Sequence, residues 1–194
     1  MRGNVDVNDH RPVTGAGSGH ARRLVLPRAA AFWLVATALF LLLFASGSAS
    51  PLYGVYQAQW RFSATTLTAV FAVYVLALLV ALLMFGSLSD YLGRRRVIAA
   101  AVTAGAGACG LFLAAHGVGP LFAARALQGA AAGSATRAGG AALIDQQPDR
   151  SQRGPVVTSA AVLLGLGAGG LGASALVQYA PAPTHLVWWL LLAA

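Results

Sequence analysis

The sequence contains no glutamate and no lysine, and only 9% of its 194 residues are charged. Charged residues supply about a quarter of an ordinary globular chain, so this composition excludes a normal water-soluble surface. Hydrophobic residues make up 58% of the chain, which favours a protein whose surface faces lipid.

Cysteine is almost absent as well. The single Cys109 excludes a disulfide framework or a cysteine-based metal site within one chain. Soluble-enzyme signatures are also missing, since there is no P-loop, no G-x-S-x-G elbow and no H-E-x-x-H pair. We therefore expect no enzyme activity, no metal and no cofactor.

All thirteen basic residues are arginine and the net charge is +8, which raises the question of nucleic-acid binding. The arginines stand mostly at the ends of apolar runs, and no basic stripe is interleaved with aromatic residues. We expect no nucleic-acid partner. The bilayer is the predicted partner.

Long uncharged stretches separate these arginines. A membrane helix needs about 20 mainly apolar residues, and each stretch has room for at least one. The sequence predicts an all-α polytopic membrane bundle over residues 29–194. The expected spans are about 29–50, 65–86, 97–115, 121–144, 156–179 and an incomplete sixth at 185–194.

Several residues are expected to shape the ends of the first two spans. We expect Pro51 to end the first span, with Tyr53 placed as an interfacial aromatic residue. The hydroxyl of Ser63 or Thr65 is expected to cap the second.

Arginine distribution predicts the orientation. Residues 1–28 are expected to form a disordered cytoplasmic tail. Positive charge then gathers on the cytoplasmic side, in the tail and in two loops (Arg2, Arg11, Arg22, Arg23, Arg28, Arg94, Arg95, Arg96, Arg150 and Arg153). Arg61 is expected on the opposite, outer side of the membrane. We predict a multi-pass protein of the cell (plasma) membrane with its N-terminus in the cytoplasm.

The turn "GSLSDYLGRRRVI" at 86–98 joins the second and third spans. As a plain topogenic turn, it needs glycines for the reversal and arginines for the cytoplasmic side. Its spacing also resembles the signature loop of the major facilitator superfamily, G-x-L-x-D-x-x-G-R-[RK]. The matching residues are Gly86, Leu88, Asp90, Gly93, Arg94 and Arg95.

A second segment, "RALQG" in the fourth span, is similar to the R-x-x-Q-G motif of many members of that family. It contains Arg125, Gln128 and Gly129. A membrane helix keeps an arginine mainly where the side chain faces the bundle interior or a water-filled cavity. We predict a substrate or proton cavity here; the alternative is a buried arginine satisfied by carbonyls. Arg137 is expected to snorkel towards the cytoplasm.

The resemblance implies a fold of twelve helices in two six-helix halves that move a small solute by alternating access. This chain resembles the N-terminal half with its sixth helix truncated, so the second six-helix half is missing from it. Asp90 and Arg94 resemble the family's gate. Proton-coupled efflux, as a symporter or antiporter, is one form of this function.

Two departures from the family's pattern weaken the interpretation as a proton antiporter. Gly165, Gly169 and Gly170 are expected to pack helices, although Gly170 stands where proton antiporters of the family often have proline. No aspartate falls inside a predicted span, so the proton carrier is expected elsewhere or at Arg125. The alternative functions are a truncated, non-transporting membrane remnant, or a half-transporter that must dimerise.

Overall fold

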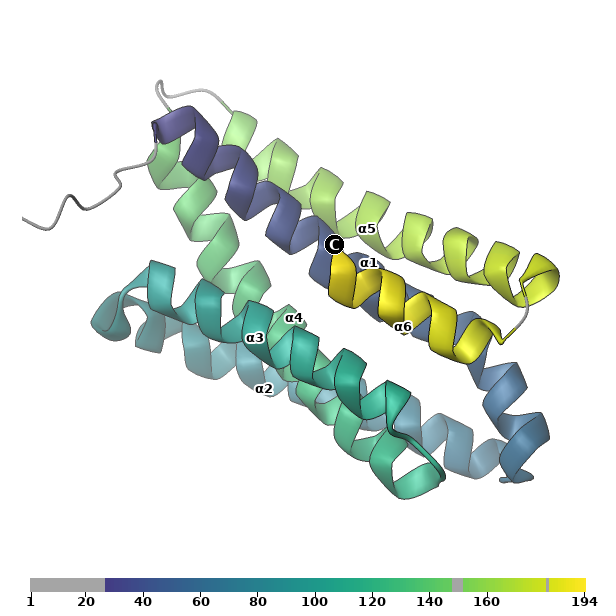
Figure 1. Ribbon diagram of the computed structural model, residues 1–194. Coiled ribbons are helices and arrows are strands. Elements are labelled where there is room, and N and C mark those ends of the chain that lie inside the picture. The colour runs from purple at the N-terminus through teal and green to yellow at the C-terminus, as the bar shows by residue number, and fades with distance from the viewer. Residues whose placement is uncertain (1–26, 148–151, 181) are drawn as a thin grey trace, which may run out of the picture.

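The computed structural model describes residues 27–147, 152–180 and 182–194, and it does not describe the side chains of residues 85–91 and 183. In these ranges every regular element is a helix, which confirms the all-α bundle (Figure 1). The helices are α1 (Arg28–Trp60), α2 (Ala64–Leu92), α3 (Arg94–Leu113), α4 (Val118–Gln146), α5 (Arg153–Tyr179) and α6 (Pro183–Ala193).

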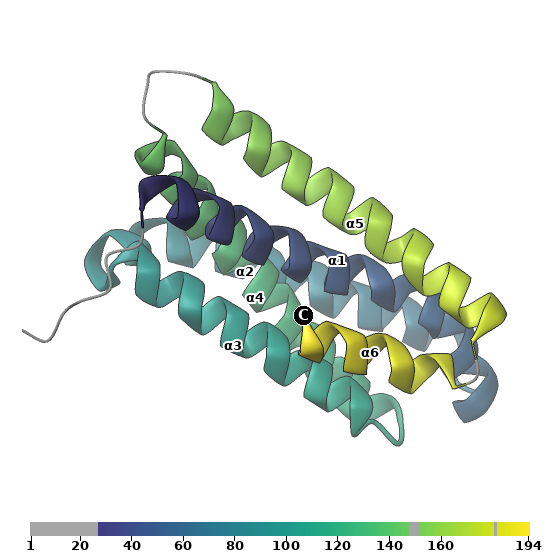
Figure 2. The ribbon, with the colours of Figure 1, turned by 45° about the horizontal axis from the view of Figure 1, so that its top comes forward.

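Helix α4 lies at the centre of the bundle. It packs against α1, α2, α3 and α5. Helix α5 in turn runs along α1 (Figures 1 and 2). The most extensive helix pairs are α1 with α5 and α2 with α4, followed by α3 with α4. Helix α6 makes fewer contacts, mainly with α3.

Four helical segments are long and apolar enough to cross a bilayer, namely α1, residues 64–84 of α2, α3 and α5. The central helix α4 is not one of them. Its buried residues are mostly alanine and glycine, which allow close packing but add little hydropathy. Its lower apolarity thus agrees with its position inside the bundle, where neighbouring helices rather than lipid cover it.

Helix α1 corrects two expectations from the sequence. Pro51 does not end it, because the helix continues to Trp60 with Pro51 inside. Tyr53 is not interfacial but buried, with 2% of its surface exposed. The proline lacks an N–H and its ring crowds the preceding turn, but packing of the following turns against neighbouring helices holds the helix together.

The connection between α2 and α3 is shorter than expected. Gly86 lies within α2, and the chain reverses at Gly93 alone, whose φ of 85° suits a residue without a side chain. Leu88 and Asp90 also lie within α2, but their side chains are among those that the structure does not describe. At the other end of α2 the predicted cap is confirmed, since the Thr66 N–H donates to Ser63 Oγ at 3.1 Å.

Glycines set the spacing of the outer helices. A Cβ on Gly165 would lie 2.8 Å from the Phe40 carbonyl oxygen of α1, and one on Gly169 would overlap the backbone of Phe44. Gly170 differs, because its nearest neighbour would be 3.9 Å away. Helix α5 therefore rests directly on the α1 backbone through Gly165 and Gly169.

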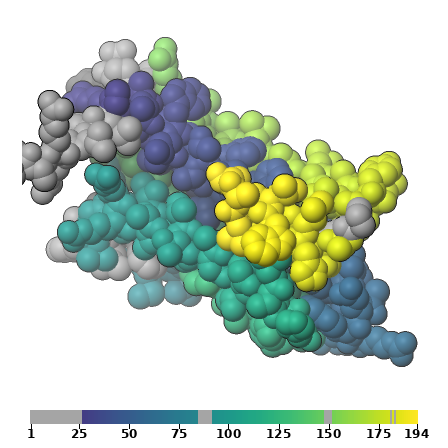
Figure 3. Space-filling view, viewed as in Figure 1, coloured from purple at the N-terminus to yellow at the C-terminus, as the bar shows by residue number. Residues whose placement is uncertain are grey.

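The short helix α6 covers part of α1 and α3 on the surface (Figure 3). Trp188 holds it there. Its ring is fully buried and stacks on Phe112 at 4.1 Å between centroids, and its Nε1–H donates to the Tyr56 hydroxyl at 3.0 Å.

Candidate functional site

Arg125 lies in the buried part of α4, where the helix meets α1 and α2. Only 2% of its surface is exposed. Its Nη1 donates to Gln128 Oε1, one turn later, at 2.6 Å, and more weakly to the Ser46 carbonyl of α1 at 3.4 Å. The sequence-predicted pair Arg125 and Gln128 is thus joined by a direct hydrogen bond.

Three aromatic rings surround the guanidinium. Its central carbon lies 4.2 Å from the centroid of Tyr74, 5.4 Å from Tyr53 and 5.6 Å from Phe71. Tyr53 and Phe71 also meet edge to face at 4.8 Å. We call the residues Arg125, Gln128, Tyr53, Phe71 and Tyr74 the arginine cage. The rings give cation–π attraction without neutralising the charge.

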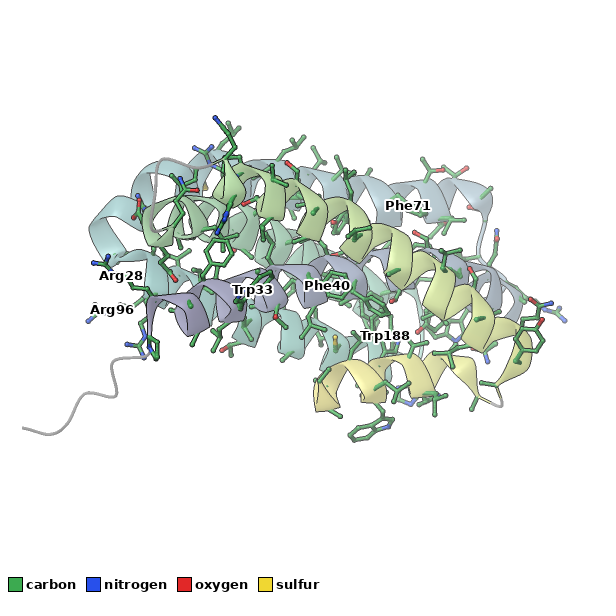
Figure 4. The ribbon with its side chains drawn as sticks, turned by 90° about the horizontal axis from the view of Figure 1, so that it is seen from above. Arg28, Trp33, Phe40, Phe71, Arg96 and Trp188 are labelled. Atoms are coloured by element: carbon green, nitrogen blue, oxygen red, sulfur yellow. The ribbon has the colours of Figure 1, made fainter. Side chains whose placement is uncertain are left out.

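The cage is asymmetric in its burial. Tyr53 comes from α1 and is buried, whereas Tyr74 of α2 is half-buried and Phe71 of α2 is 37% exposed. In the view of Figure 4, Phe71 on α2 and Trp188 on α6 lie on opposite sides of the bundle. The thinnest wall of the cage is therefore the ring of Phe71 on the α2 side.

Gly129 positions α2 for this cage. A Cβ at Gly129 would overlap the Tyr74 carbonyl oxygen and lie 3.1 Å from the Ala77 side chain. The glycine lets the α2 backbone approach α4 closely enough for the Tyr74 ring to reach Arg125. The role of Gly129 in the geometry is thus close packing beside the cage.

Hydrogen bonding in the cage is incomplete. Three buried atoms, Arg125 Nε, Gln128 Nε2 and Tyr53 Oη, have no partner among the described residues. No acidic side chain of the described part of the chain pairs with Arg125. The cage therefore combines a positive charge with spare donors, an arrangement suited to a ligand that supplies acceptors.

The signature turn forms a second polar cluster at the opposite end of α4. Arg94, the first residue of α3, donates to the Ala141 carbonyl at 2.9 Å and forms an ion pair with Asp145 in the last turn of α4. A cation at a helix start and an anion at a helix end are each unfavourable for their own helix dipole. Pairing the two charges offsets both penalties. Arg95 is exposed.

This pair favours the ionised form of Asp145. The hydrogen bond from Arg94 lowers the pKa of the Asp145 carboxyl below its ordinary range. Sequence reasoning did not single out Asp145. An acid at the C-terminal end of a helix was the available signal, because such a residue needs a nearby cation.

A comparison with models of protein families gives a match. The family model described as Major Facilitator Superfamily matches residues 35–194 of the sequence. These residues cover α2 to α6 and most of α1. A comparison with curated proteins gives no match.

Proposed function

The chain belongs to the major facilitator superfamily and is a multi-pass membrane transporter of that type, and we propose that it moves a small solute by alternating access, with the arginine cage as its solute site. The observation that carries the proposal is the buried Arg125 with no acidic partner in the described residues. A charge within a membrane bundle is costly, and helices that retain one mostly use it for function.

A second six-helix half completes the transport path in this proposal. The large exposed apolar side chains gather on α2 and α5, for example Val75, Leu79 and Leu83 on α2, and Leu163 and Leu171 on α5. Phe71, the thinnest wall of the cage, belongs to the same face of α2. We expect the second half to contact α2 and α5, so that its movement opens or closes the cage.

The signature turn acts as the gate. Gly93 makes the reversal between α2 and α3, and Arg94 is held over the end of α4 by Asp145 and Ala141. Such a pair, exposed to water, is weak enough to exchange partners during a conformational change. Asp90, Arg95, Gly86 and Leu88 are proposed to contribute to the same gate.

Orientation follows from charge. Helices α1, α3 and α5 begin at Arg28, Arg94 and Arg153, and these three ends lie together at one end of the bundle (Figures 1 and 4). Arg61 follows the last residue of α1, and that end of α1 lies at the other end of the bundle. We infer a cytoplasmic N-terminus in the plasma membrane. The described spans contain no buried acid, so a coupling proton is expected to bind in the second half.

The proposal is tested in liposomes containing the purified protein, with labelled amino acids, sugars, carboxylates and cationic drugs as candidate solutes. Entrapped pyranine reports any accompanying proton flux. Solute movement that Arg125→Ala abolishes supports transport through the cage. Movement that survives this substitution removes Arg125 from the site. No movement of any solute by protein shown to be a folded dimer, in which a second copy supplies the second half, favours a non-transporting membrane protein.

A further inference from the structure

The unpartnered groups of the arginine cage share one chemical property. Arg125 Nε–H, the Gln128 Nε2 amide and the Tyr53 hydroxyl can all donate a hydrogen bond, and none has an acceptor among the described residues. Gln128 Oε1, the one strong side-chain acceptor of the cage, already accepts from Arg125. Each buried donor left unpaired costs about 1–3 kcal/mol, so the set is poorly satisfied without a ligand.

The charge of the cage points in the same direction. Arg125 is 2% exposed and has aromatic rings, an amide and a backbone carbonyl around it, but no carboxylate from the described residues. Cation–π contacts recover only about 0.5–2 kcal/mol of the cost of burial. An unpaired buried cation with free donors needs a negative charge that carries acceptor oxygens.

We propose that the cage binds the anionic group of its solute, a carboxylate or similar oxyanion, which rests on the proposed function of the same site. Charge-assisted hydrogen bonds join one oxygen to Arg125 Nε–H, and the other oxygen accepts from both the Gln128 amide and the Tyr53 hydroxyl. The guanidinium remains protonated throughout.

The donor set also argues against Arg125 as a proton carrier. Arginine is already protonated at any physiological pH and cannot release its proton readily. Among the described residues the cage has no carboxylate or imidazole that could accept one. The geometry therefore favours recognition of an anion over proton transfer.

Calorimetry on the full purified chain in detergent at pH 7.5 tests this inference, with empty micelles as the blank. The probes are benzoate, acetate and inorganic phosphate. Benzamide, which has the shape of benzoate without its charge, is the matched neutral probe. We expect at least one anion to bind, and benzoate to bind at least about tenfold more tightly than benzamide.

Gln128→Glu is the sharpest variant. It places a carboxylate beside Arg125 Nη1, so the guanidinium gains an internal counter-ion and has less need of an external one. We expect the affinity for the anion to fall by at least about tenfold while the fold is kept. Gln178→Glu adds the same charge at an exposed position of α5 and should leave affinity unchanged.

Tyr53→Phe removes the hydroxyl beside the Arg125 guanidinium and keeps the aromatic ring. We expect a loss of about tenfold in anion affinity, whereas Tyr179→Phe, at an 81% exposed position, should have no effect. Helical circular dichroism and gel-filtration volume confirm that each variant is folded. Because Tyr53→Phe keeps the ring, it gives a readout even if Gln128→Glu misfolds.

Two results would overturn the inference: no binding of any of the three anions, or full anion affinity in both Gln128→Glu and Tyr53→Phe. Its failure is distinguishable from that of the proposed function. If Arg125→Ala abolishes solute movement while no anion binds, transport stands and the anion inference falls. If anions bind the cage but no solute moves, the site stands and the transport proposal falls.

Discussion

Arg125 and Arg94 lie near opposite ends of α4 and meet their surroundings in opposite ways. The side chain of Arg94 is 32% exposed, and an acid of the same chain, Asp145, neutralises it. Arg125 is buried, and rings, an amide and a carbonyl surround it instead. The chain supplies a counter-charge where water already screens the cation, and supplies none in the described residues where burial makes the charge most costly.

This difference assigns different tasks to the two arginines. The Arg94 pair offsets two unfavourable helix dipoles and leaves no strong demand for another partner. The arginine cage keeps three buried polar atoms without a hydrogen-bond partner, and only a group outside the described residues can supply one. A site that is costly for the fold is where function is expected, because stability alone would favour an apolar residue there.

The largest effect is expected from Arg125→Met, which keeps a long side chain but removes the charge and its donors. Anion affinity should fall by about a hundredfold or more. The melting temperature, followed by tryptophan fluorescence in detergent, should stay the same or rise, because an unpaired buried cation is lost. Arg137→Met, at an exposed position of the same helix, is the control and should change neither quantity. A large fall in melting temperature for Arg125→Met would mean that the cage is structural.

Gly129→Ala tests the cage without altering its polar groups. The added methyl group overlaps the α2 backbone at Tyr74, so α2 must move and take the Tyr74 and Phe71 rings away from Arg125. We expect a loss of about 1–3 kcal/mol in stability, and weaker anion binding. Gly110→Ala, where a Cβ meets open space in α3, is the matched control and should be neutral. Equal behaviour of the two variants would show that close approach at Gly129 is dispensable.

The sequence predicted much of this arrangement because its signals are local. Uncharged runs indicated the helices, and "RALQG" marked the helix turn that holds Arg125 and Gln128. The hydroxyl of Ser63 caps α2 as expected. In each case the residues involved lie within a few positions of one another, so spacing along the chain already determines their relation.

The parts that the sequence did not predict depend on contacts between distant segments. Pro51 suggested a helix end by its own chemistry, but packing of Leu52, Tyr53 and Tyr56 against the bundle carries α1 onward. The same packing turns Tyr53 from an expected interfacial residue into part of the cage. Asp145 acquires its role only because α3 begins beside the end of α4.

Arg94→Ala is expected to have a smaller effect than the cage variants. It removes the ion pair with Asp145 and the hydrogen bond to the Ala141 carbonyl, both at the water-facing end. Exposed pairs contribute about 1 kcal/mol or less, so the melting temperature should fall by only a few degrees. A double-mutant cycle with Asp145→Asn isolates the coupling, and Arg95→Ala is the exposed neighbour for comparison. A coupling energy near zero would contradict a stabilising role for the pair.

The smallest effect is a dependence on pH that only the Arg94 end should show. Because the pKa of Asp145 is lowered in the folded protein, its contribution to stability is complete above the carboxyl's ordinary value and disappears as the pH falls below it. The melting temperatures of the wild type and Asp145→Asn should therefore differ near pH 6, begin to approach each other at about pH 4, and meet only below the lowered pKa of the folded protein. Comparing the two proteins cancels the titration of the other aspartates, since both contain them. A difference between the curves that does not shrink at all as the pH falls below about 4 would show that Asp145 acts through its shape and not its charge. The cage contains no group that titrates in this range, so Arg125→Met should shift the whole curve by a constant amount and leave its pH dependence unchanged.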